Sequence, residues 1–272
     1  MKKDRVNALV LTGYGLNCDG ETAHACELAG ASARRVHIND VIDGSVDLSE
    51  FQLLVFIGGF SWGDDHGAGV VQAVRMKKNA GDRIVRFVED GNLVFAICNG
   101  FQTLVNMGLL PGLDLDYRRR TVALTNNDCG NFRDDWTRLR VNPASPCVFT
   151  RGIDQIELPV RHGEGKFIAG DDIIDRLRDN HQIVCRYAME DGAPAQGRFP
   201  NNPNGSMDDI AGICDPSGRI FGLMPHPEAY NHPTNHPDWC RRKWRGAKDN
   251  VSVTLPLGLR IFENAVDYIS GP

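Results

Sequence analysis

The sequence lacks the cysteine pattern of a disulfide framework or of a zinc ribbon. Its eight cysteines are scattered along 272 residues, and no two of them form a C-x-x-C pair. Unpaired cysteines of this kind are typical of a reducing compartment, so we expect a cytoplasmic protein. The eight are Cys18, Cys26, Cys98, Cys129, Cys147, Cys185, Cys214 and Cys240.

An excess of positive charge and a long hydrophobic run are also missing. The chain has 30 Lys and Arg against 35 Asp and Glu, a net charge of -5, which argues against binding nucleic acid or an anionic membrane. The apolar run from Ala8 to Leu11 is too short for a signal peptide or a membrane span. Repeats, low-complexity segments and linkers are absent. We therefore expect one domain over residues 1–272 that acts on a small molecule.

Strands and helices alternate up to Met107, which predicts a parallel sheet connected by crossover helices. Shorter strands follow, spaced like an antiparallel extension. The predicted fold class is therefore α/β, with an open, mainly parallel sheet flanked by helices and an antiparallel extension. Expected strands are 6–11, 33–38, 51–57, 93–97, 121–124, 136–141, 155–160, 183–187, 210–213 and 220–224, and expected helices are 19–30, 70–90 and 101–107.

Cys98 follows the apolar run from Leu93 to Ile97 directly, so it is expected at the carboxyl edge of the sheet. Gly100 removes a side chain where a sharp strand-to-helix turn brings backbones together. This pattern is typical of a nucleophile elbow, with cysteine in place of the usual serine. The start of the following helix favours the thiolate. A buried structural cysteine is the alternative, since free cysteines are often buried.

Gly58 and Gly59 follow the expected strand 51–57, at the same edge as Cys98. This loop lacks the Lys and Ser/Thr of a P-loop and the spacing of a dinucleotide fingerprint. Its backbone N–H groups suit an oxyanion hole, which a thiolate attacking a carbonyl requires. The alternative is an ordinary tight turn.

His226 and Glu228 flank a proline after the last expected strand. Residues two apart in an extended backbone point the same way, so we expect the two side chains to project together. A cysteine nucleophile needs a base, and that base needs an acceptor that fixes its tautomer. The pair therefore complements Cys98, although an isolated H-x-E pair more often lies on the surface without a catalytic role.

Five segments occur in a specific order: 58–64, 97–102, 161–167, 202–206 and 224–228. Together they resemble the glutaminase subunits of phosphoribosylformylglycinamidine synthase, a family of class I (triad) glutamine amidotransferases. The resemblance runs from about Val6 to Glu228 and again over the final helix.

The resemblance implies a triad of Cys98, His226 and Glu228 that hydrolyses L-glutamine to glutamate and ammonia through a thioester on Cys98. It also implies binding of the substrate and its oxyanion by six further residues, which are Gly59, Phe60, Asn99, Gln102, Asn127 and Phe132.

The family delivers ammonia to a large synthetase subunit, together with a small accessory subunit. The synthetase converts formylglycinamide ribonucleotide to formylglycinamidine ribonucleotide in de novo purine biosynthesis. ATP and Mg are expected on that partner, whereas this chain is expected to carry no cofactor and no metal.

Residues 131–136 depart from the family pattern. A segment resembling R-F-E-C-R-W lines the glutamine site in the family, but here Asp134 and Asp135 replace its cysteine and arginine. The way in which glutamine binds at this place is therefore an open question.

The segment 230–255 is longer than the family's usual connection to the last helix. Two prolines prevent one continuous helix from presenting its possible metal ligands, so zinc is not expected here. We expect a basic loop that contacts a partner. The possible ligands are His232, His236 and Cys240, the prolines are Pro233 and Pro237, and the loop contains Trp239, Arg241, Arg242, Lys243, Trp244 and Arg245.

Two other functions stay open. Cysteine-elbow hydrolases of the deglycase and protease-like group also carry a thiol on such a sheet, but His226 with Glu228 so far along the chain argues against them. A docking subunit that does not hydrolyse glutamine is the second alternative, which Asp134 and Asp135 favour and the triad opposes.

Overall fold

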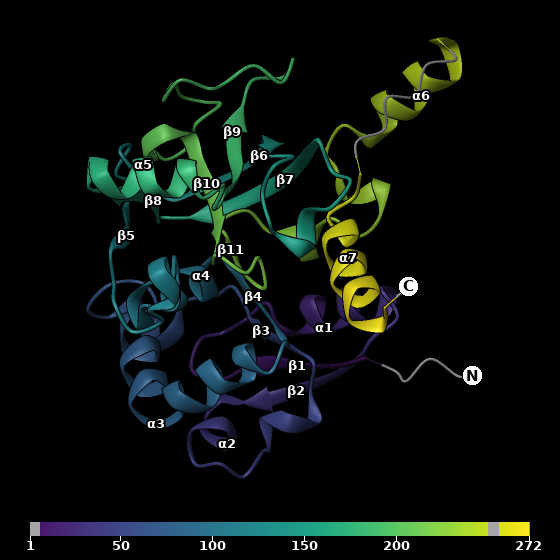
Figure 1. Cartoon of the computed structure of the whole chain (residues 1–272). Coiled ribbons are helices and arrows are strands. Elements are labelled where there is room, and N and C mark those ends of the chain that lie inside the picture. The colour runs from purple at the N-terminus through teal and green to yellow at the C-terminus, as the bar shows by residue number, and fades with distance from the viewer. Residues whose placement is uncertain (1–5, 250–255, 272) are drawn as a thin grey trace.

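A nine-stranded sheet forms the centre of the computed structural model, which describes residues 6–249 and 256–271 (Figure 1). Its strands are β1 (Asn7–Thr12), β2 (Ser32–His37), β3 (Leu53–Phe56), β4 (Leu93–Ile97), β6 (Arg133–Val141), β7 (Gln155–His162), β9 (Ile183–Ala188), β10 (Ile210–Cys214) and β11 (Ile220–Leu223). A separate two-stranded sheet pairs β5 (Val122–Asn126) with β8 (Glu164–Ala169).

The strand order is β2-β1-β3-β4-β11-β10-β9-β6-β7. Neighbours from β2 to β11 pair in parallel, and neighbours from β11 to β7 pair antiparallel. The predicted fold class is confirmed, because a parallel α/β half continues into an antiparallel extension.

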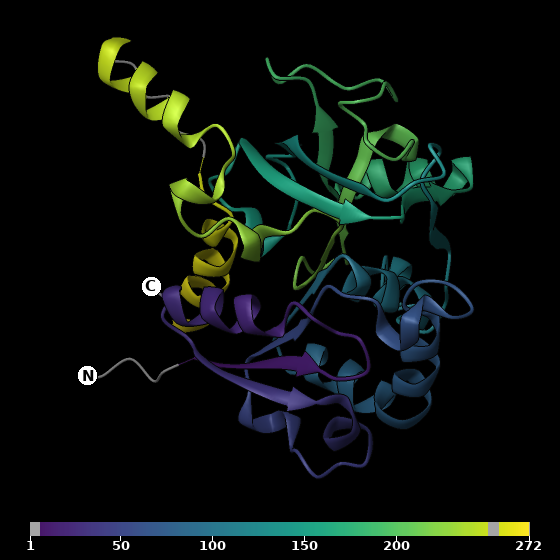
Figure 2. The same cartoon turned by 180° about the vertical axis from the view of Figure 1, so that it is seen from behind.

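Seven α-helices lie among the described residues, and α1 and α7 cover one face of the parallel half while α3 and α4 cover the other (Figures 1 and 2). They are α1 (Asp19–Leu28), α2 (Ile38–Ile42), α3 (Val70–Glu89), α4 (Asn99–Met107), α5 (Asp171–Asp179), α6 (Trp239–Asp249) and α7 (Leu259–Ser270). Short 3-10 turns are η1 (Leu48–Glu50), η2 (Ser61–Asp64), η3 (Leu113–Leu115), η4 (Val148–Thr150), η5 (Met207–Asp209), η6 (Pro227–Ala229) and η7 (Pro233–Asn235).

Aromatic rings fill the core between the parallel half and α7. Phe95 on β4 and Phe221 on β11 stack with centroids 5.5 Å apart, and Phe262 of α7 meets Phe95 edge-on at 5.5 Å. These rings are fully buried. Each stabilises the fold by about 2 kcal/mol, because its apolar surface is removed from water. The packing fixes β4 and β11 as neighbours at the centre of the sheet.

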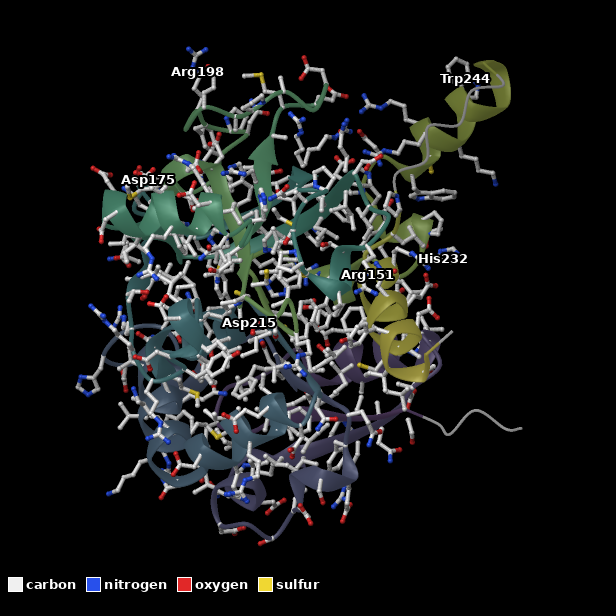
Figure 3. The ribbon with its side chains drawn as sticks, in the orientation of Figure 1. Arg151, Asp175, Arg198, Asp215, His232 and Trp244 are labelled. Carbon is white, nitrogen blue, oxygen red and sulfur yellow. The ribbon has the colours of Figure 1, made fainter. Side chains whose placement is uncertain are left out.

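Strand register brings the predicted functional segments to one edge. Phe56 of β3 pairs with Ala96 of β4, and Ile97 pairs with Leu223 of β11. Three parallel strands therefore end side by side, so the loops that follow them meet. Asp215, labelled in Figure 3, holds the turn that leads into β11 by accepting the N–H groups of Arg219 and Ile220, each at 2.9 Å.

The predicted strands and the three predicted helices are present, with ends displaced by a few residues. The predicted loop over 239–245 is wrong, because these residues form the first part of α6. The sequence there has few apolar residues, so helical periodicity gives no signal. The elements β8 and α5 were not predicted either.

Helix α6 extends from the antiparallel half, and Trp244 lies on its projecting part with 63% of its surface exposed (Figure 3). The start of the helix is fixed to the sheet, where Arg242 pairs with Glu157 of β7 at 2.6 Å. His236 packs on Trp136 with centroids 4.4 Å apart. The start of α6 is thus part of the folded body.

Candidate active site

Cys98 lies in a strained turn between β4 and α4. Its φ of 50° and ψ of -107° are unusual for a residue with a side chain, and a sharp elbow requires them. Its N–H donates to Leu223 O at 2.8 Å, and its Sγ lies 3.6 Å from Arg161 O. The predicted elbow is therefore present, with a thiol that is 5% exposed.

Gly100 allows α4 to lie directly against β3. A Cβ at this position would lie 2.1 Å from Phe56 O, a backbone atom that cannot move aside. The close approach of the two backbones requires a glycine, as the sequence predicted, and this approach sets the position of Cys98 two residues earlier.

His226 and Glu228 come together after β11. Nδ1 of His226 lies 2.6 Å from Oε1 of Glu228, and both side chains are buried. The expected extended backbone holds only for His226, because Glu228 lies in the 3-10 turn η6. The His226 N–H donates to Pro159 O at 2.8 Å, which attaches this segment to β7.

Burial alone would lower the pKa of His226, but the carboxylate of Glu228 and then Cys98 outweigh it, so the pKa is raised well above its usual value. Cys98 therefore lies near enough to act on the imidazole. Thiol, imidazole and carboxylate form one electrostatic unit, and an imidazolium is available at neutral pH.

A second thiol, not predicted from the sequence, lies beside this unit. Ligand atoms of Cys18, His226 and Glu228 lie within 4.8 Å of one another. Burial raises the pKa of the Cys18 thiol, a hydrogen bond to His226 partly offsets this, and Glu228 raises it further. A Cβ on Gly58 would lie 2.7 Å from Cε1 of His226 and 3.1 Å from Sγ of Cys18. Gly58 therefore makes room for both side chains.

The glycine loop presents an open N–H group at Gly59. Gly59 has φ of 143°, and a Cβ there would lie 2.7 Å from Gly15 O. The Phe60 N–H already donates to Gly15 O at 2.9 Å. Within the described residues the Gly59 N–H has no acceptor, nor does the N–H of Asn99 at the first position of α4. These two groups suit a developing oxyanion.

Polar side chains next to Cys98 form a chain that runs from the Asp64 carboxylate to the backbone carbonyl of Glu164. Asn99 donates to Asp64 at 3.0 Å and to Oε1 of Gln102 at 3.3 Å, and Gln102 donates to Glu164 O. Burial and then the Glu164 carboxylate raise the pKa of Asp64 to about 6. Two neighbouring carboxylates favour binding of a cation.

Asn127 holds the segment 162–165 in place, and both the nitrogen and the oxygen of its side-chain amide form hydrogen bonds. Its Nδ2 donates to His162 O at 2.8 Å and to Asn131 O at 3.0 Å, while its Oδ1 accepts from Gly165 N and pairs with Nδ1 of His162, each at 3.1 Å. Burial and then His226 lower the pKa of His162 to about 3, so this imidazole is neutral. His162 was not predicted as a site residue.

Phe60 and Phe132 are exposed and lie with ring centroids 6.1 Å apart. Asp134 is directly opposite Arg161 across β6 and β7, with their charged atoms 3.8 Å apart. Asp135 accepts the N–H of Trp136 at 2.8 Å. Both aspartates that depart from the family pattern are therefore on an exposed surface, and Arg161 compensates one of them.

Over 6–249 and 256–271, Cys18, His226 and Glu228 are the one group of three side chains spaced to hold a metal ion. His232, His236 and Cys240 do not form such a group. Instead, His232 pairs with Thr234 at 2.8 Å, and the N–H of Asp238 donates to His236 at 3.0 Å.

None of the described helices combines the length and the apolar character needed to cross a membrane.

The family model for the CobB/CobQ-like glutamine amidotransferase domain matches residues 5–269. A phosphoribosylformylglycinamidine synthase subunit PurQ from Dehalococcoides mccartyi is 46% identical over 264 residues, covering 97% of this chain and 98% of the relative. The PurQ subunit from Methanococcus maripaludis is 42% identical over 264 residues, covering 96% and 97%.

A solved structure described as PurLQS from Thermotoga maritima aligns with a TM-score of 0.70 and 29% identity, covering 98% of this chain and 100% of that chain. The resemblance drawn from the five segments is confirmed. The chain belongs to the CobB/CobQ-like glutamine amidotransferase family.

Proposed function

We propose that this chain is the glutaminase subunit of a phosphoribosylformylglycinamidine synthase. The printed name of the PurQ relatives supports this function. The observation that carries it is the buried pair of His226 and Glu228, 2.6 Å apart, next to a cysteine in a strained elbow. Hydrolysis of an unactivated amide needs these three groups together.

The reaction proceeds in two halves. The Cys98 thiolate attacks Cδ of glutamine, and the tetrahedral intermediate collapses as the C–N bond breaks and the His226 imidazolium gives its proton to the leaving nitrogen. Ammonia departs and a glutamyl thioester remains. The neutral His226 then takes a proton from water, the hydroxide attacks the thioester, and glutamate leaves as the thiolate re-forms.

Two backbone donors stabilise the negative oxygen of the intermediate. The N–H groups of Gly59 and Asn99 are open, whereas that of Phe60 is bonded to Gly15. We therefore assign the donor role within this loop to Gly59. Loss of one such donor typically costs about 3 kcal/mol of transition-state stabilisation.

Glutamine is held by its charged end as well as by its amide. The half-buried carboxylate of Asp64, with Glu164 nearby, suits the α-ammonium group of the substrate. Gln102 connects Asp64, through Asn99, to the backbone carbonyl of Glu164, and the exposed rings of Phe60 and Phe132 are assigned to contact with the substrate. Asn127 acts indirectly, because its amide is used to hold the segment 162–165.

Ammonia passes to a synthetase partner, which uses ATP and Mg to form formylglycinamidine ribonucleotide, and a small accessory subunit completes the complex. The PurLQS structure, which aligns with all but 2% of this chain, supports such a complex. This chain carries no cofactor of its own in the proposal. Its eight free cysteines support a cytoplasmic location, and its continuous central sheet supports a single domain over residues 1–272.

Replacement of Cys98 by alanine in the assembled complex tests the function. We expect glutamine-dependent product formation to stop while ammonium-dependent formation continues, because the partner's chemistry does not need the thiol. Both activities are measured on the same preparation. Loss of both would indicate a structural cysteine, and wild-type complex that uses ammonium but not glutamine would indicate a docking subunit.

A further inference from the structure

Cys18 has no part in the reaction, yet it lies against the two residues that serve Cys98. The sulphur of Cys18, a ring nitrogen of His226 and a carboxylate oxygen of Glu228 all lie within 4.8 Å of one another and are buried. Cys18 precedes α1, whereas the other two follow β11, so strands far apart in sequence bring the three together.

Glu228 keeps an unused polar atom. Within the part of the chain that the structure describes, its Oε2 is buried without a hydrogen-bond partner. The thiol of Cys18 has a weak contact with Oδ1 of Asn17 at 3.7 Å. The cluster therefore has a carboxylate oxygen whose lone pairs no hydrogen bond occupies.

We propose that Cys18, His226 and Glu228 form an inhibitory binding site for Zn²⁺. One sulphur, one nitrogen and one oxygen ligand with an open fourth position are a donor set that zinc accepts in proteins. The inference rests on the proposed function. When zinc is bound to His226 and Glu228, His226 can no longer act as the base and Glu228 can no longer orient it. Zinc bound here stops glutamine hydrolysis.

Binding requires one local change. Nδ1 of His226 and Oε1 of Glu228 are 2.6 Å apart, but two ligand atoms on one tetrahedral zinc lie roughly 3.3 Å apart. The hydrogen bond between them must open, and the free Oε2 of Glu228 gives the carboxylate a second way to bind. Cys18 and the His226–Glu228 pair release protons on binding, so zinc affinity rises with pH.

Zinc binding is tested first in the full chain with Cys98→Ser, which removes a thiolate that would itself compete for zinc beside His226. Competition with a chromogenic chelator gives the affinity and stoichiometry. We expect one equivalent of Zn²⁺, and a loss of at least about 100-fold in affinity when Cys18→Ala is added. Cys26→Ala is the matched control, because Cys26 is a fully buried thiol on α1 outside the cluster.

Co²⁺ gives an independent readout, since a thiolate-to-metal absorption band requires a sulphur ligand. The band is expected in Cys98→Ser and absent from Cys98→Ser with Cys18→Ser. If Cys98→Ser does not bind Zn²⁺, or if both chains bind it equally, the proposal is wrong.

Inhibition is measured in the complex with Cys98 intact. Cys18→Ala is expected to raise the Zn²⁺ concentration for half-inhibition at least tenfold, and Cys18→Ser reports the same shift if the alanine variant is unstable. Unchanged inhibition in a folded Cys18 variant overturns the proposal. Glutamine hydrolysis without zinc is recorded in every variant, so failure of the zinc site is distinguished from failure of the glutaminase function.

Discussion

Nδ1 of His226 lies 2.6 Å from Oε1 of Glu228, and both side chains are buried. A buried charge of this kind is stable only while its partner is present. The pair therefore controls both the protonation of the catalytic base and part of the stability of the fold at this edge of the sheet.

Glu228→Gln keeps the size of the side chain and removes its charge. We expect kcat for glutamine hydrolysis to fall about 10³- to 10⁴-fold, because His226 loses the group that orients it and stabilises its imidazolium. Steady-state rates in the complex measure this, with ammonium-dependent synthesis as the control. A loss of less than about tenfold would contradict the assigned role.

The same variant changes the pH dependence of stability. The pKa of His226 is raised above 6.5 in the folded chain, so the stabilisation is fully present below pH 6.5 and is lost as pH rises through the folded value. In Glu228→Gln this dependence should disappear from the free energy of unfolding, measured by denaturant titration at several pH values.

Gly58→Ala tests how closely the imidazole must be positioned. The new Cβ would lie 2.7 Å from Cε1 of His226, so the ring has to move. A displacement of this kind costs roughly 100-fold in kcat, with little change in KM. Gly63→Ala is a suitable control, since nothing lies within 4 Å of its Cβ, although its positive φ adds a small strain. Wild-type kcat in a folded Gly58→Ala chain would contradict the prediction.

Asp64→Asn separates substrate binding from stability. The pKa of Asp64 is raised to about 6, so between pH 3.8 and 6 the folded chain keeps a proton that the unfolded chain has released, and stability falls as pH rises. The variant should be about 1 kcal/mol more stable at neutral pH, a value reduced for partial exposure, and unchanged below pH 3.8.

KM for glutamine should rise in Asp64→Asn, because the α-ammonium group loses a counter-charge. Thermal or denaturant unfolding and initial rates measure the two effects on one preparation. A variant that is both less stable at neutral pH and unchanged in KM would show that Asp64 has only a structural role.

Much of the site could be predicted from the sequence because its main features are local. A strand ending at Cys98, a glycine two residues later and an H-x-E pair are patterns within a few residues. The elbow and the pairing are present, although Glu228 lies in a 3-10 turn where an extended backbone was expected. Proline on either side of His226 is compatible with both conformations.

The residues that were missed depend on tertiary contacts. Cys18 meets His226 only because β1 and β11 end at the same edge, and His162 is placed by the amide of Asn127. The pKa of Asp64 is raised by burial and then by Glu164, which lies 100 residues away in the sequence. Helix α6 was missed because its sequence is basic and has few apolar residues, so no apolar stripe marks it.

Helix α6 gives a final prediction about assembly. Lys243 is exposed and lies 5.9 Å from the ring of Trp239, whereas Arg242 is committed to Glu157. Lys243→Glu should weaken binding to the synthetase about fivefold to tenfold and reduce its salt dependence, because a basic helix at an interface acts mainly through charge. Lys78→Glu is the control, because it makes the same change at an exposed position on α3. Binding is measured by titration at two salt concentrations, and equal affinities of the two variants would exclude α6 from the interface.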